Sequence, residues 1–244
     1  MSIDVTFGPS IRAVPFDYLW PSGVATELLT DHQRRHLESI ATVRLLPVRT
    51  VLFNAGAPAD AIFMISRGVT KSYRELRGGK QRVMAFMFPS DLLGLAEGGH
   101  YVNSVQALTP ATVYSIPVAV LKESFRRDFA LQFNFLCKVT HELRQAQRQL
   151  ISIGRRDASG KFATFLETLQ RNTTLGTDAA PGNGARQIWL PMTRMDIANY
   201  LGLTHETLSR AASRLVRQGV LGFPDRHHVQ ILDSARLHKL ADPL

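Results

Sequence analysis

Apolar and polar residues alternate in different patterns along this chain, and each pattern predicts a different kind of element. Over residues 1–20 apolar residues alternate with turn formers, which predicts a loosely held arm, and residues 26–42 have helical spacing. From about 43 to 120, short runs rich in β-branched and aromatic residues are separated by Gly, Pro, Asn and Asp. These runs predict strands over 50–53, 61–66, 69–76, 82–88, 102–107 and 111–116. Strands so short and closely spaced indicate an antiparallel sandwich or β-roll.

The pattern then changes to that of one long helix over residues 118–155. Within it, a narrow apolar line recurs at alternating intervals of three and four residues, as in the a and d positions of a coiled coil. We call these residues the seam: Leu136, Val139, Leu143, Ala146, Leu150 and Ile153. Packing of this helix on its own β-domain is the alternative. A narrow apolar face between polar neighbours favours pairing with a second copy, so we expect a homodimer.

A pair of short helices joined by a tight turn is predicted over residues 193–210. Thr193 suits the N-cap of the first helix, with Asp196 three residues later. Gly202 suits a left-handed C-cap, and Thr204 caps the second helix. Small Ala198 allows the two helices to cross closely. Amphipathic helix pairs with a glycine turn also occur in proteins that do not bind DNA, so the exposed residues must decide between the two interpretations.

The second helix of this pair has one apolar face and one polar, charged face. Its predicted inward residues are Leu208, Ala211, Ala212 and Leu215. Its outward residues include Glu206, Ser209, Arg210 and Arg214. In a helix-turn-helix such residues face the DNA major groove. Arginine can donate two hydrogen bonds to guanine and glutamate can accept one from cytosine, so we expect Arg210 and Glu206 to read these bases. Ser209 is expected to bond a base edge or a phosphate.

Further residues around the helix pair are candidates for phosphate contacts. They are Thr193, Arg194, Thr204, Arg214 and Arg217. A helix over 160–171, a polar loop over 172–185 and a short strand over 187–190 precede the pair. After it, residues 222–232 predict a β-hairpin wing, and Asp233 caps a terminal helix. The C-terminal region therefore has the pattern of a winged helix-turn-helix.

Length and charge support this organisation. A chain of 244 residues suits two domains with separate cores, and the predicted elements make an α+β fold. Residues 1–120 hold 11 Lys and Arg against 9 Asp and Glu, whereas residues 121–244 hold 18 against 11. Most of the formal charge of +9 thus lies in the C-terminal half, which favours a polyanionic partner. We expect a sensor-like β-roll with its arm and helix over 1–120, a dimerisation helix over 121–156 and a winged helix-turn-helix over 157–244.

Other features bear on the compartment. Cys137 is the single cysteine, so no internal disulfide is possible. No apolar run approaches the length of a membrane span, and the N-terminus lacks a signal-peptide pattern. These observations predict a cytoplasmic protein without a membrane partner.

The order of β-roll, seam helix and winged helix-turn-helix resembles the cAMP receptor protein/FNR superfamily of bacterial transcription regulators, over about residues 28–240. The stretch from Leu190 to Arg210, LPMTRMDIANYLGLTHETLSR, is very similar to the FNR and FixK branch. The runs AIFMISRG (61–68), KSYR (71–74) and FPSDLLG (88–94) resemble the strand and turn signature of the family's roll. The resemblance implies that Glu206, Ser209 and Arg210 read a TTGA half-site, and that RNA polymerase is a partner.

The chain departs from the ligand-binding patterns of this family. Cyclic-nucleotide binders carry Gly-Glu and then Arg-Ser or Arg-Thr. Here Gly94 precedes Leu95 and Ala96, and Asn103 stands near the arginine position, before Ser104. Without that guanidinium the resemblance does not imply cAMP binding. With one cysteine, the chain lacks the four thiolates of an iron–sulfur cluster.

Heme and redox sensing are alternatives. Candidate heme ligands in or near the sensor half are His32, His36, His100 and His141. Cys137 is a candidate redox switch, although a helical cysteine beside a seam residue is more often inert packing. We expect no cofactor and a regulator that is active without an effector; the alternative is a sensor gated by heme or another small molecule.

The sequence disfavours two further classes of function. No nucleophile with a neighbouring base, no metal-ligand spacing and no phosphate-cradling loop stands out in the sequence, so we do not expect an enzyme. The glycine pairs at 78–79 and 98–99 predict hairpin turns instead. A roll that gates a partner without binding DNA is disfavoured by the Glu-x-x-Ser-Arg pattern of the second helix.

Overall fold

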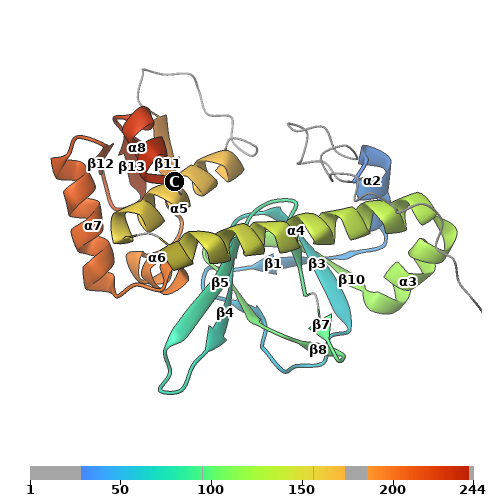
Figure 1. Cartoon of the computed structure of the whole chain (residues 1–244). Helices are drawn as coiled ribbons and strands as arrows, with labels where there is room; N and C mark the ends of the chain where they lie inside the picture. The colour runs from blue at the N-terminus through green and yellow to red at the C-terminus, as the bar shows by residue number, and fades with distance from the viewer. Residues whose placement is uncertain (1–28, 95, 156, 174–185, 242–244) are drawn as a thin grey trace, which may run out of the picture.

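The computed structural model describes residues 29–94, 96–155, 157–173 and 186–241. The predicted arm over 1–20 and most of the loop predicted over 172–185 lie outside these residues. The described chain forms a β-roll, a long helix that crosses it, and a helical domain with a small sheet at one end of that helix (Figure 1). The architecture is the expected α+β fold.

The roll begins with helix α2 (Asp31–Ser39), which has a capping box between Thr30 and Gln33. Within the described residues, two antiparallel sheets have the strand orders β1-β10-β3-β6 and β2-β9-β4-β5, and β7 and β8 form a separate hairpin. The strands are β1 (Thr42–Leu46), β2 (Val51–Phe53), β3 (Ala61–Arg67), β4 (Thr70–Glu75), β5 (Gln81–Met87), β6 (Leu92–Leu93), β7 (Ala96–Glu97), β8 (His100–Tyr101), β9 (Ser104–Ala107) and β10 (Ala111–Pro117).

The six predicted strands correspond to β2, β3, β4, β5, β9 and β10, with ends that differ by at most two residues. Four strands were not predicted. Three of them, β6 to β8, have two residues each, too few to show an alternation. The fourth, β1, is exposed at four of its five positions, so its sequence carries no buried face. As an edge strand it is held by pairing with β10.

The interior of the roll is apolar and aromatic. Buried residues from both sheets form its core: Leu46, Leu52, Ala61, Phe63, Ile65, Leu93, Tyr101, Val105, Ala107, Ala111 and Val113. The ring of Tyr101 stacks on that of Phe53 with centroids 4.0 Å apart, and Phe53 stacks in turn on Phe63. The turn after β3 is tight, because a Cβ on Gly68 (φ +88°) would lie 2.4 Å from the Pro110 carbonyl oxygen.

The single helix predicted over 118–155 is wrong, because the chain forms two helices, α3 (Val118–Arg127) and α4 (Phe129–Arg155). Asp128 between them is extended (φ −132°, ψ 96°), and its carboxylate accepts a hydrogen bond from the Leu131 amide at 2.9 Å. The break lets Leu121 of α3 and Leu131 of α4 bury against the same cluster. The domain boundary predicted between residues 120 and 121 accordingly falls inside α3.

The C-terminal domain is a winged helix-turn-helix. Its elements are α5 (Ala158–Thr173), β11 (Arg186–Trp189), α6 (Arg194–Leu201), α7 (His205–Arg217), β12 (Leu221–Gly222), β13 (His228–Ile231) and α8 (Ser234–Ala241). The sheet order is β11-β13-β12, in which β12 and β13 form the predicted wing. Asp233 accepts a hydrogen bond from the Arg236 amide and so caps α8, as predicted. No described helix is long and apolar enough to cross a membrane.

Candidate nucleic-acid interface

The two helices of the predicted pair have the expected caps. Thr193 accepts a hydrogen bond from the Asp196 amide, and the Asp196 carboxylate accepts one from the Thr193 amide, which completes a capping box. Gly202 ends α6 in the left-handed conformation (φ 67°, ψ 34°). The hydroxyl of Thr204 accepts from the Thr207 amide and begins α7. Local hydrogen bonds therefore define both ends of the turn.

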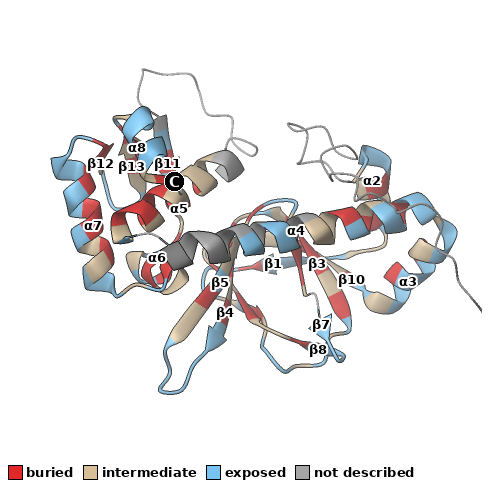
Figure 2. Ribbon diagram, in the orientation of Figure 1, coloured by how far each residue is buried: buried red, intermediate tan, exposed pale blue. Residues whose placement is uncertain are grey.

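Helix α7 is divided lengthwise into a buried and an exposed face (Figure 2). Leu208, Ala211, Ala212 and Leu215 are all buried, as the sequence predicted. Ala198 of α6 is completely buried. The absence of a larger side chain there permits close packing of the two helices. The core of the domain thus holds α7 with its polar face outward.

The exposed face of α7 forms a surface pocket. Its lining consists of Glu206, Ser209, Arg210, Ser213, Arg214 and Arg217. The side chains of Glu206 and Arg210 are 76% and 73% exposed and lie 3.4 Å apart. So exposed a pair contributes little to stability, which leaves both groups available to a ligand. The three predicted base readers therefore lie together on the N-terminal half of this face, and Arg214 and Arg217 lie on its C-terminal half.

Ser213 was missed by the sequence interpretation. It lies on the same face as Glu206 and Ser209, at intervals of seven and four residues. Helical spacing alone was the signal that could have found it. Its hydroxyl adds a neutral donor and acceptor to a lining that is otherwise mostly charged.

Two of the predicted phosphate-contacting residues, Arg214 and Arg217, line this face, and the other three lie at the N-terminal ends of α6 and α7. The guanidinium of Arg194 stacks 4.6 Å from the ring centroid of Phe223, at the start of the wing. Arg214 lies 3.9 Å from the Asp157 carboxylate, with both side chains at least 60% exposed. Arg217 is exposed in the last turn of α7. The hydroxyls of Thr193 and Thr204 serve the caps described above, so capping is their observed role.

The turn of the wing is organised by Asp225. Its carboxylate accepts hydrogen bonds from the His227 amide at 2.7 Å and from Nδ1 of His228 at 2.8 Å. These bonds hold the pKa of Asp225 below its usual value, first through the backbone bond. In the sequence FPDRHH, Arg226 therefore lies within a turn that the bonds of Asp225 to His227 and His228 hold in place.

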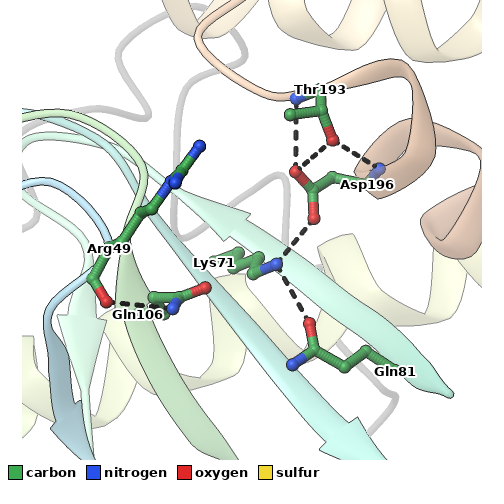
Figure 3. Close-up of polar contacts among 6 residues, drawn as sticks. All are labelled: Arg49, Lys71, Gln81, Gln106, Thr193 and Asp196. Atoms are coloured by element: carbon green, nitrogen blue, oxygen red, sulfur yellow. Dashed lines mark hydrogen bonds and ion pairs between the residues drawn. The ribbon is translucent and has the colours of Figure 1, made fainter. Parts of the chain in front are cut away.

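The winged domain is docked on the roll through a buried ion pair. Nζ of Lys71, on β4, lies 2.6 Å from Oδ1 of Asp196 and 3.1 Å from Oε1 of Gln81 (Figure 3). The side chains of Lys71 and Asp196 are only 8% and 10% exposed. The other carboxylate oxygen of Asp196 remains bonded to Thr193. One carboxylate thus joins the cap of α6 to the roll.

An aromatic contact adds to this docking. The ring of Phe86, on β5, lies 5.0 Å from that of Tyr200 and 5.9 Å from that of Phe165, centroid to centroid. Burial raises the pKa of Tyr200 to about 12. A Cβ on Gly202 would lie 2.8 Å from Nη1 of Arg82, so the turn of the helix pair touches the roll as well. Contacts from β4 and β5 therefore run along α6 from its first turn to its C-cap.

The residues that the family resemblance places at a nucleotide site, Gly94, Asn103 and Ser104, lie among side chains of the roll. Next to Gly94, the rings of Tyr101 and Phe63 lie 3.1 and 3.2 Å from where a Cβ would stand. The hydroxyl of Ser104 accepts a hydrogen bond from the Ala55 amide, and that of Tyr101 donates to the Ala61 carbonyl. Asn103 supplies a neutral amide where cyclic-nucleotide binders of the family carry an arginine.

The seam lies partly on the exposed face of α4. Leu136 and Leu143 are 60% and 58% exposed, whereas Val139 packs partly against the cluster beneath the helix. The side chains of Ala146, Leu150 and Ile153 lie outside those described. Phe129 and Phe133, which the sequence interpretation left out, are 77% and 46% exposed on the same helix. They precede Leu136 by seven and three residues and so extend its line.

The cysteine and the described histidines proposed as sensor residues lie in buried, hydrogen-bonded or exposed positions within the roll and its helices. The thiol of Cys137 is buried, and burial raises its pKa, which disfavours the reactive thiolate. Nε2 of His36 lies 3.2 Å from Oγ of Ser124, Nδ1 of His100 lies 3.0 Å from the Gly98 carbonyl, and His32 is exposed. The side chain of His141 lies outside those described. No cluster of three metal-ligating side chains occurs among the described residues.

Comparison with protein-family models gives two matches. A Crp-like helix-turn-helix domain matches residues 160–240, and a cyclic nucleotide-binding domain matches residues 43–128. The first match covers the helix pair and the wing, and the second covers the roll from β1 to the end of α3.

Curated relatives and solved structures agree with these models. Regulatory protein HlyX of Actinobacillus pleuropneumoniae is 31% identical over 197 residues, which are 79% of this chain and 80% of HlyX. Nitrogen fixation regulation protein FixK of Rhizobium meliloti is 29% identical over 78% of this chain and 83% of FixK. The structure of FixK2 from Bradyrhizobium japonicum superposes with a TM-score of 0.75 at 29% identity, covering 84% of this chain and 99% of that one.

Proposed function

Because the chain belongs to the CRP/FNR family of transcription regulators, in its FNR and FixK-like branch, we propose that it is a homodimer that binds a palindromic DNA site with TTGA-type half-sites. Proteins of this family are regulators and not enzymes. The observation that carries the proposal is the exposed face of α7, where Glu206, Ser209 and Arg210 lie together. In this proposal Arg210 donates to guanine and Glu206 accepts from cytosine.

In this proposal, contacts to DNA phosphates fix the position of the recognition helix α7 along the duplex. Arg217 and Arg214 lie on the C-terminal half of the same face, and Arg194 lies beside the wing. Thr193 and Thr204 stand at the starts of the two helices, where backbone amides also face outward. These groups bind any sequence alike, whereas base specificity comes from the three readers.

The second part of the proposal is the dimer. Leu136 and Leu143 of the seam are exposed, and Phe129 and Phe133 continue the apolar line towards the N-terminus of α4. Pairing of two α4 helices along this line removes these side chains from water. It also presents two copies of α7 to successive major grooves, ~34 Å apart. RNA polymerase is the proposed protein partner, and the cytoplasm is the proposed compartment.

The third part concerns the effector. We propose that DNA binding requires neither cAMP nor an iron–sulfur cluster nor another cofactor. The packing of Tyr101 and Phe63 against Gly94, and the amide of Asn103 in place of a guanidinium, support the absence of a nucleotide site. A single buried cysteine supports the absence of a cluster.

Binding of the purified protein to fluorescent duplexes tests all three parts. We expect tight, salt-dependent binding to a TTGA palindrome without added ligand, weaker binding when either half-site is scrambled, and no change with cAMP. An unchanged affinity for the scrambled duplex contradicts the proposed site. A cAMP-dependent affinity, or a heme absorption band in the protein as purified, favours instead a ligand-gated sensor of the same family.

A further inference from the structure

The structure assigns to Lys71 of the roll the role of a positioning residue, which holds α6 on β4 and thereby sets the orientation of the recognition helix α7 relative to the rest of the chain. This inference rests on the proposed binding of a dimer to a palindrome. Lys71 lies 125 residues from Asp196 in the sequence and is not among the base-reading or phosphate-contacting candidates. Its effect on DNA is therefore indirect.

The ion pair of Lys71 forms only when the winged domain and the roll are correctly placed relative to each other. Both side chains are almost fully buried, and Nζ is shared between Asp196 at 2.6 Å and Gln81 at 3.1 Å. A buried charge is strongly destabilising when its partner is lost, even where the intact pair adds little net stability. A small rotation or shift of the winged domain, in which both side chains stay buried, would leave the two charges unpaired. The pair thus selects one docked arrangement over its neighbours.

The ion pair acts directly on the helix pair that reads DNA. Oδ2 of Asp196 accepts from the amide and the hydroxyl of Thr193, while Oδ1 faces Lys71 (Figure 3). Lys71 therefore holds the first turn of α6. Because α6 packs on α7 through the fully buried Ala198, any displacement of α6 is transmitted to α7.

Two further contacts fix the angle of α6 as well as its position. Phe86 packs against Tyr200 in the last turn of α6, and Arg82 touches Gly202 at its C-cap. Together with Lys71, these residues of β4 and β5 hold both ends of the helix. A helix held at both ends cannot pivot about a single contact.

The consequence is a fixed distance between the two recognition helices of a dimer. Half-sites are read together only when two copies of α7 meet grooves about one turn, ~34 Å, apart. If the docking is released, each winged domain is tethered to α4 mainly by the short connection around residue 157 and samples several orientations. We infer that Lys71 makes the protein selective for the spacing of half-sites, separately from their sequence.

The test compares Lys71→Met with Lys80→Met. Methionine preserves the length and apolar stem of the buried lysine but removes its charge. Lys80 is exposed in the turn between β4 and β5, so its variant loses the same charge from the surface of the roll. Affinity is measured for TTGA palindromes whose central spacer is shortened or lengthened by one or two base pairs, and for a duplex with a single half-site.

For the wild-type protein and Lys80→Met we expect affinity to fall roughly tenfold or more when the spacer changes by two base pairs. For Lys71→Met we expect the fall to be less than about threefold, with weaker binding at the best spacer and unchanged affinity for the single half-site. Preference for TTGA over a scrambled half-site is retained. A Lys71→Met profile as sharp as that of the wild type overturns the inference, and so does equal flattening by Lys80→Met.

A second variant covers the case in which Lys71→Met does not fold. Phe86→Leu keeps an apolar side chain but removes the ring that meets Tyr200 and Phe165. It is expected to flatten the spacing profile in the same direction, and a sharp profile in this folded variant overturns the inference. Wild-type protein that fails to bind the palindrome contradicts the proposed function itself, which distinguishes that failure from a wild-type-like variant.

Discussion

At the scale of single residues, two of the candidate base readers are charged groups that the fold leaves exposed to water. Glu206 and Arg210 lie one helical turn apart and contact each other at 3.4 Å, but both remain more than 70% exposed. Such a pair is weak in water, so either partner can exchange it for a base edge with little loss.

Substitution of Arg210 by alanine tests the base assignment. We expect Arg210→Ala to weaken binding to the TTGA palindrome by about 1–3 kcal/mol and to relax the preference at one base position. Arg217→Ala is the matched control, because it removes the same charge from the same face. It should weaken all sequences alike and reduce the slope of log affinity against log salt. Affinity and salt titrations of both variants supply the measurement; an unaltered base preference in Arg210→Ala would be evidence against the assignment.

The phenol of Tyr200 makes stability depend on alkaline pH. Burial raises its pKa to about 12 in the folded protein, whereas the unfolded value is near 10. Between these values the unfolded chain has lost the proton and the folded chain retains it, so the folded state loses stability as pH rises. We expect the free energy of unfolding by urea to fall more steeply from pH 10 to 12 in the wild type than in Tyr200→Phe. Parallel pH profiles for the two proteins would refute this expectation.

At the scale of elements, the first helix of the helix-turn-helix is short and is capped at both ends. Helix α6 has eight residues, too few to be stable by backbone hydrogen bonds alone. Its first turn is held by the reciprocal Thr193–Asp196 capping box, and its last by Gly202. Packing against α7 and β5 supplies the remaining stabilisation.

Removal of the cap tests how far α6 depends on it. We expect Thr193→Ala to lower the free energy of unfolding by about 1 kcal/mol, because the variant leaves the Asp196 amide without its side-chain acceptor. Thermal or urea unfolding measures the difference. Thr193→Ser retains the hydroxyl and serves as the control. Equal stability of the alanine and serine variants would show that the cap is unimportant here.

At the scale of the whole molecule, α4 connects the roll to the winged domain and carries the proposed dimer seam. One side of α4 is buried on the roll through Leu131 and Phe135, and the opposite side exposes Phe129, Leu136 and Leu143. A helix with two apolar sides in one chain indicates that the second side is covered by another molecule. The same helix then sets both the dimer and the placement of the readers.

Charge on the seam tests the dimer. We expect the double variant Leu136→Asp, Leu143→Asp to be monomeric by sedimentation or light scattering, because pairing would bury two carboxylates on each chain without counter-ions. Its affinity for the palindrome should approach that for a single half-site. Leu76→Asp is a suitable control, since Leu76 is also exposed (52%) but lies in the β4–β5 turn. A dimeric double variant would place the interface elsewhere.

The sequence by itself determined the elements whose signals are local. The longer strands of the roll, other than β1, follow from alternation and turn residues, and the caps at Thr193, Gly202 and Thr204 act over at most four residues. The outward face of α7 follows from helical periodicity. Each of these features depends on neighbours in the chain, which is why the candidate base readers could be named before the structure.

Only the tertiary structure decided how these elements are joined. The break at Asp128 arises because α3 and α4 bury against one cluster, and a continuous helical pattern carries no sign of it. The Lys71–Asp196 ion pair joins residues 125 positions apart, and a lysine in a strand is ordinarily exposed. Burial of that lysine depends on the packing of two domains, which no local pattern encodes. The candidate base readers could therefore be named from the sequence, whereas the contacts that orient them could not.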